Sequence, residues 1–152
     1  RAKYDDLREL AEKYTKNKQY DQALEAWLEI RRLRPMDELP HKRLAGIYLT
    51  KQVNQPEKAI EHLTALASME SKDSRWAKRV ARIYRDAGKF EEAAKSALLA
   101  VYTDPYDLDG HKLLAELYEK TGDKAGLERE TRVIAELEKW IENNRKRSTL
   151  GS

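Results

Sequence analysis

Four copies of a five-residue pattern, [Leu/Val]-Ala-x-x-Tyr, constrain the fold of this chain more than any other feature of its sequence. The copies occupy residues 10–14, 44–48, 80–84 and 114–118, so their tyrosines lie 34, 36 and 34 residues apart. A fixed period of this length is typical of repeat proteins, in which each unit is a small element that stacks on its neighbours. The pattern therefore predicts repeats near residues 4–37, 38–73, 74–107 and 108–141.

Other landmarks follow each tyrosine at a constant distance. In the third repeat, Ala93 lies nine residues after Tyr84, and Pro105 lies 21 residues after it. The first repeat keeps both spacings. In the second repeat the equivalent alanine, Ala59, comes two residues late, so an insertion near residues 53–56 accounts for the longer period.

Each repeat is predicted to form two helices joined by a turn. In the third repeat we expect Ser74 to cap the first helix and Gly88 to end it. The second helix should begin at Phe90 and end before Pro105, and Asp107 should cap the helix that follows. No stretch alternates between apolar and polar residues over a useful length, so no strand is predicted and the fold class is all-α.

The core should lie between the two helices of each repeat. Leu10, Ala11 and Tyr14, with their equivalents, share one face of the first helix, where the small alanine lets a second helix approach closely. The second helices present matching stripes, namely Ala23, Trp27 and Ile30, then Ala59, Leu63 and Leu66, then Ala93, Ala97 and Ala100. One pair cannot bury both faces alone, so the pairs should stack into a solenoid.

Taken together, these features resemble the tetratricopeptide repeat (TPR). The 34-residue period, the small residue three before the tyrosine, the alanine nine after it and the closing proline all match. The resemblance covers about Tyr4 to Ile141 and implies a right-handed solenoid of four antiparallel helix pairs. We expect residues 1–147 to form a single TPR-like array and residues 148–152 to form a tail.

The fourth repeat departs from the family pattern. Leu127 and Thr131 replace the usual alanine and aromatic residue, and Lys139 replaces the closing proline, as Ser71 does in the second repeat. We interpret this repeat as a terminal unit. Its long second helix, expected from about residue 124 to 144, would cap the end of the core, as solenoids require.

Composition narrows the function classes. Charged residues make up 38% of the 152 residues, yet the net charge is only +3, too small an excess to predict nucleic-acid binding by itself. No cysteine is present and no apolar run is long enough to cross a membrane. We expect a soluble chain and favour the cytoplasm. Because the sequence begins with Arg1, we expect a fragment of a longer protein, with Gly151-Ser152 as a cloning remnant.

No catalytic, cofactor-binding or metal-binding site is predicted. His41 and His111 occupy matching positions on the packing face and are expected to be packed or half-buried, whereas His62 is expected at the surface. Nucleophile, phosphate-binding and zinc motifs are absent from the sequence. The basic tracts at residues 31–34 and 143–147 are expected to lie near helix C-termini, where the macrodipole favours cations.

The face of the first helices opposite the tyrosine is the candidate site. In the third repeat five of its six positions are basic, and like charges one helical turn apart repel each other. The resemblance implies that this face lines the concave groove in which TPR proteins bind peptides. The cations on it are Arg8, Lys42, Arg43, Arg75, Lys78, Arg79, Arg82 and Arg85. An ordinary solvated face remains the alternative.

Some TPR proteins grip acidic chaperone tails with lysine and asparagine residues on three first helices. The corresponding positions here are Arg8, Glu12, Arg43, Arg75 and Arg79. Both asparagines are missing and Glu12 would repel a carboxylate, so this clamp is not predicted. A looser acidic segment still suits arginine, which binds carboxylates through two donors.

The sequence therefore predicts a protein-interaction module that binds an anionic peptide or partner segment in the concave groove. One alternative is a TPR appendage that positions a catalytic domain of a larger enzyme outside this fragment. Another is RNA binding through the basic groove, although we expect a protein partner rather than nucleic acid. The partner's identity and the oligomeric state stay open.

Overall fold

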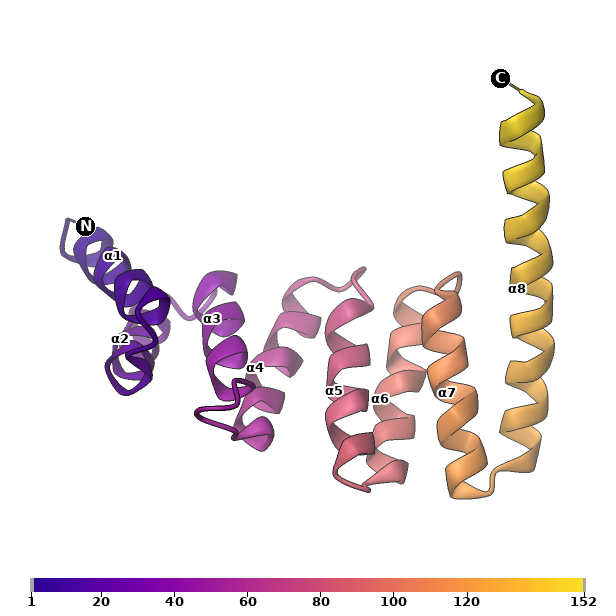
Figure 1. Ribbon diagram of the computed structural model, residues 1–152, viewed down its shortest axis with the longest axis horizontal. Helices are drawn as coiled ribbons and strands as arrows, with labels where there is room; N and C mark the ends of the chain where they lie inside the picture. The colour runs from indigo at the N-terminus through magenta and orange to yellow at the C-terminus, as the bar shows by residue number, and fades with distance from the viewer. Residues whose placement is uncertain (1, 152) are drawn as a thin grey trace. The chain divides into compact units, whose positions relative to one another are not determined.

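The computed structural model describes residues 2–151, and all regular structure in this range is helical (Figure 1). The helices are α1 (Ala2–Lys16), α2 (Tyr20–Leu33), α3 (Glu38–Tyr48), α4 (Pro56–Met69), α5 (Arg75–Asp86), α6 (Phe90–Thr103), α7 (Leu108–Thr121) and α8 (Lys124–Leu150). Each predicted repeat thus contains one helix pair, and the all-α prediction is confirmed. The chain divides into two compact units, unit 1 (Arg1–Glu70) with α1–α4 and unit 2 (Ser71–Ser152) with α5–α8.

The predicted apolar stripes form the core of each unit. The stripe residues of α2, α4 and α6 are all fully buried. In unit 2 the alanines of α6 pack with Ala81, Leu114 and Leu117, and Tyr84 lies partly buried against this cluster. Leu10 is an exception, because it is 41% exposed although its place in the motif predicts burial.

One turn design joins the two helices of every pair. A residue with positive φ lies in the turn after the first helix, and the next residue donates its N–H to the carbonyl of the motif tyrosine. The left-handed residues are Lys18, Asn54, Gly88 and Gly122, with φ of 58°, 46°, 76° and 79°. In the second pair Gln55 makes this bond to Tyr48 at 2.8 Å, so the two inserted residues lengthen the turn without changing how it closes.

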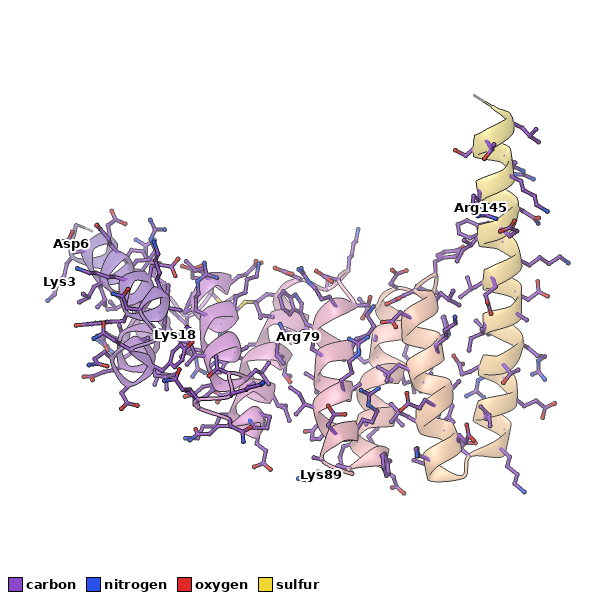
Figure 2. All side chains as sticks on the ribbon, in the orientation of Figure 1. Lys3, Asp6, Lys18, Arg79, Lys89 and Arg145 are labelled. Atoms are coloured by element: carbon purple, nitrogen blue, oxygen red, sulfur yellow. The ribbon has the colours of Figure 1, made fainter. Side chains whose placement is uncertain are left out.

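Replacing Lys18 with glycine is expected to stabilise unit 1 by about 0.5–1 kcal/mol. A residue with a Cβ is strained at positive φ, whereas glycine adopts that region readily. Lys18 is exposed, so the change removes no packing (Figure 2). Urea unfolding measures the effect, followed by Trp27 fluorescence in a Trp76→Phe and Trp140→Phe background so that only unit 1 is reported. The control Glu9→Gly, at an exposed position inside α1, should destabilise by a similar amount. A Lys18→Gly variant no more stable than wild type would contradict the strain argument.

Two predicted helix ends are wrong. Ser74 does not cap α5, because Asp73 accepts the hydrogen bond from the backbone N–H of Arg75 at 2.9 Å, while the Ser74 hydroxyl donates to Asp107 at 2.7 Å. The last helix does not end near residue 144 but continues to Leu150. No proline and no glycine interrupts it between Gly126 and Gly151, so residues 143–147 lie within the helix and residues 148–150 are helical.

Candidate functional site

Two of the three predicted site cations of unit 1, Lys42 and Arg43, lie beside carboxylates. The Arg43 guanidinium donates to both oxygens of Glu12, at 2.8 and 3.1 Å. Lys42 lies 3.5 Å from Glu38 and 3.2 Å from Glu70. The open groove between α1 and α3, about 620 Å³ in volume, is lined by Asp5, Arg8, Glu9, Glu12, Leu39 and Arg43. With three acids and two bases, this part of unit 1 does not present a positive wall.

Most of the cations on α5 are also paired, and their partners come from the next first helix. Lys78 contacts Asp107 at 2.9 Å and Asp109 at 3.2 Å. Asp109 also accepts from Arg82, and Glu116 lies 3.4 Å from Arg85. Arg75 instead contacts Asp73, two residues before α5. The excess positive charge expected on this helix is therefore largely neutralised within unit 2.

In three of these ion pairs, the two partners are separated by the same number of residues. Arg43 and Glu12, Lys78 and Asp109, and Arg85 and Glu116 are each 31 residues apart, slightly less than one repeat. A helical wheel of one helix does not show these pairs, because each acid lies on a different helix from its cation. A search for opposite charges at this offset would have found the partners.

Arg79 is the exception among the cations of α5. Its side chain is half-buried on α5 (labelled in Figure 2), and no acceptor in the range 2–151 pairs with its guanidinium. Burial lowers the pKa of Arg79, and the neighbouring charges of Arg75 and Arg82 lower that pKa further. Helix α5 therefore holds a partly desolvated cation next to two others, and the described part of the chain supplies no anion for it.

The histidines form two buried pairs instead of a site. His41 is buried as expected, but His62 is also buried, with its Nδ1 3.1 Å from Nδ1 of His41. The surface prediction for His62 is wrong because it lies three residues after Ala59, on the stripe that α4 turns inward. His111 contacts Glu130 at 2.6 Å. Among the described residues, no group of three side chains could hold a metal ion.

Solved structures of other proteins share this arrangement of helices. A crystal structure of MamA matches with a TM-score of 0.69 and 14% identity, over 92% of this chain and 81% of that one. MamA from Desulfovibrio magneticus RS-1 matches with a TM-score of 0.63 and 19% identity, over 90% and 76%. Naa15, in a structure of Naa15/Naa10 bound to HypK-THB, gives 0.59 and 20% identity, over 93% of this chain and 21% of that one.

These neighbours have TPR-like folds, and the described helix pairs carry the TPR landmarks in register. The chain has the tetratricopeptide-repeat fold. No family model and no curated protein matches the sequence, so the TPR assignment rests on the repeat pattern and the fold. Within residues 2–151, no helix has the length and apolar character needed to cross a bilayer.

Proposed function

We propose that this TPR chain is a protein-interaction module that binds an anionic segment of a partner protein on the first-helix face of unit 2, with Arg79 as the anchor. The supporting observation is the half-buried Arg79 guanidinium, which has no acceptor among residues 2–151. A partner carboxylate would supply the missing charge and accept two parallel hydrogen bonds from the planar guanidinium.

The other cations on the face should contribute less. Arg82 and Lys78 already interact with Asp109, so a partner carboxylate would have to compete with this aspartate. The face is also open to water and salt, which weaken exposed ion pairs. The expected affinity is therefore in the micromolar range and falls as salt increases.

An arginine-to-alanine comparison on α5 tests the anchor. The probe is a fluorescein-labelled octaglutamate peptide, measured by anisotropy at low and at physiological salt. Arg79→Ala is expected to weaken binding about tenfold or more, as for the loss of one charged hydrogen-bonding partner. Arg82→Ala is the matched control, one turn along the same helix, and should weaken binding only a few-fold because its guanidinium already has a partner.

The same assay separates the protein-binding and RNA-binding hypotheses. An octauridylate RNA carries similar charge on a different backbone, and we expect it to bind more weakly than octaglutamate. Tighter binding of the RNA would favour RNA as the ligand. Equal losses for Arg79→Ala and Arg82→Ala would show that the face acts only as diffuse charge and that Arg79 is no anchor.

A second candidate function is an appendage that positions a catalytic protein. The fold likeness to Naa15, which was solved together with Naa10 and HypK, favours this candidate because it places a similar helical array within a multiprotein assembly. The coding sequence that flanks residues 1–152 tests it, since the candidate requires a catalytic domain of the same larger enzyme outside these residues.

A further inference from the structure

Within residues 2–151, no helix covers the outward face of α1 in the way that α2 covers α3 and α6 covers α7. In unit 1, α2 packs on α3, and in unit 2, α6 packs on α7, so Leu44 and Leu114 are 0% exposed. Leu10 occupies the same motif position on α1 and is 41% exposed. A shallow hollow of about 300 Å³ surrounds it, lined by Leu7, Leu10, Tyr14, Gln22, Glu25, Ala26 and Glu29.

The last helix, α8, is not apolar at the positions that correspond to the covered face of α6. The residues of α6 that face α7 include Ala94, Leu98 and Val101, which are buried or partly buried. The equivalent positions of α8 hold Glu128, Arg132 and Ala135, all exposed. These three positions of α8 are therefore suited to water, although Trp140 and Ile141 elsewhere on α8 are 50% and 40% exposed. The outward face of α1, in contrast, is apolar at the position where its equivalents are covered.

Two residues of opposite charge lie along one side of the exposed apolar residues of α1. Asp6 and Lys13 are exposed, and neither has an ion-pair partner among residues 2–151. At 100° per residue they lie about 20° apart, on the same side of Leu10. They are placed almost symmetrically along the helix, four residues before Leu10 and three residues after it.

This symmetry matches an antiparallel copy of the same helix. When two α1 helices face each other about a twofold axis at Leu10, Asp6 of each copy lies opposite Lys13 of the other, and the leucines meet at the centre. We propose that two copies of this chain pair through the outward faces of α1, giving an isologous dimer. A single helix pair buries less than the roughly 800 Å² per partner of a standard interface, so the dimer should be weak.

Sedimentation of the full chain over about 10 µM to 1 mM tests the pairing, a range that brackets the expected affinity. The weight-average mass should rise from 17.7 kDa toward twice that value. Leu10→Glu should remain monomeric at every concentration with unchanged helicity, because its side chain is already exposed. The matched control, Leu99→Glu on α6, replaces a leucine that is 53% exposed and should dimerise like wild type.

Charge reversal tests the antiparallel register. Asp6→Lys and Lys13→Asp should each weaken the dimer several-fold, because each creates two like-charge contacts across the twofold axis. The double variant restores both pairs and should dimerise like wild type. Three results would overturn the proposal: a monomer at about 1 mM, single reversals without effect, or growth beyond a dimer. The first would mean that another chain or segment covers this face. The proposed ligand site on α5 is unaffected by any of these results.

Discussion

Replacing Glu130 with alanine is expected to lower the free energy of unfolding of unit 2 by about 2–3 kcal/mol, the upper part of the range for leaving a buried polar group without its partner. Glu130 is only 4% exposed, and its carboxylate lies 2.6 Å from Nδ1 of His111. The other ring nitrogen of His111, Nε2, lies 2.8 Å from the carbonyl oxygen of Pro105. The ring thus links α8 to the turn before α7, and losing the carboxylate leaves one ring nitrogen without a partner beside an empty volume.

Tryptophan fluorescence can report on unit 2 alone. The chain has three tryptophans, and a Trp27→Phe background leaves only Trp76 and Trp140, which both lie in unit 2. Urea titrations in this background compare Glu130→Ala with the control Glu128→Ala, whose side chain is 76% exposed in its pair with Arg132. The control should change stability by less than about 0.5 kcal/mol. Equal effects would mean that the buried pair does not hold α8 in place.

An amide at the same position separates hydrogen bonding from charge. Glu130→Gln keeps the shape of the side chain and provides an N–H that can donate to a neutral imidazole. Its expected cost is about 1 kcal/mol, the typical value of one hydrogen bond. A Glu130→Gln variant as unstable as Glu130→Ala would show that the negative charge, rather than the contact, stabilises unit 2.

The helices and the core were predictable because they depend on short-range patterns. The stripe of Ala23, Trp27 and Ile30 recurs at helical spacing, and each glycine or proline that ends a helix lies within a few residues of the end it determines. Ser74 was assigned the wrong role because the neighbouring Asp73 supplies the same hydrogen bond. Two neighbouring side chains could each accept the hydrogen bond at the start of α5, and the packing of the helices decides which one does.

The partners of the charged residues were not predictable from single helices. Glu130 lies in a run of alternating charges on α8, where nothing local distinguishes a buried carboxylate from its exposed neighbours. Its position becomes special only when α8 packs against the turn before α7. In the same way, the acids that neutralise Lys78 and Arg85 lie 31 residues away, so the charge of the candidate face depends on the neighbouring repeat. Arg79 stands out only after these pairs are known.

Acidification is expected to destabilise unit 1 through the buried pair of His41 and His62. Burial lowers the pKa of His62 to about 4, with Glu61 opposing the shift and His41 and Arg31 adding to it. Burial also lowers the pKa of His41, as does Arg31, while Glu61 and Asp37 oppose this shift. The two Nδ1 atoms lie 3.1 Å apart, so one ring donates and the other accepts. A second proton bound at this contact would place an N–H group on each Nδ1 atom, so that the two N–H groups repel each other.

The direction of the pH effect follows from proton binding. In the unfolded chain the pKa of His62 is near 6.5. Above this pH His62 is neutral in both the folded and the unfolded chain, so its protonation does not reduce the stability. As the pH falls below that value, the unfolded chain binds a proton that the folded chain excludes until its own pKa, about 4, is reached. At about 1.4 kcal/mol per pH unit, unit 1 should lose about 2 kcal/mol between pH 7 and pH 5, and about 3 kcal/mol by pH 4. The lowered pKa of His41 adds to this loss.

A His62→Gln variant provides the comparison for this effect. Glutamine keeps a donor and an acceptor but does not titrate, so the variant should be less stable than wild type at pH 7 and should lose less stability on acidification. In a background of Trp76→Phe and Trp140→Phe, Trp27 reports on unit 1 alone, and urea titrations at pH 7, 6 and 5 measure both slopes. Because His41 remains, the variant should keep part of the slope. If both proteins lose the same stability from pH 7 to pH 5, a group other than His62 causes the pH dependence. The contact between the two imidazoles then does not govern the acid stability of unit 1.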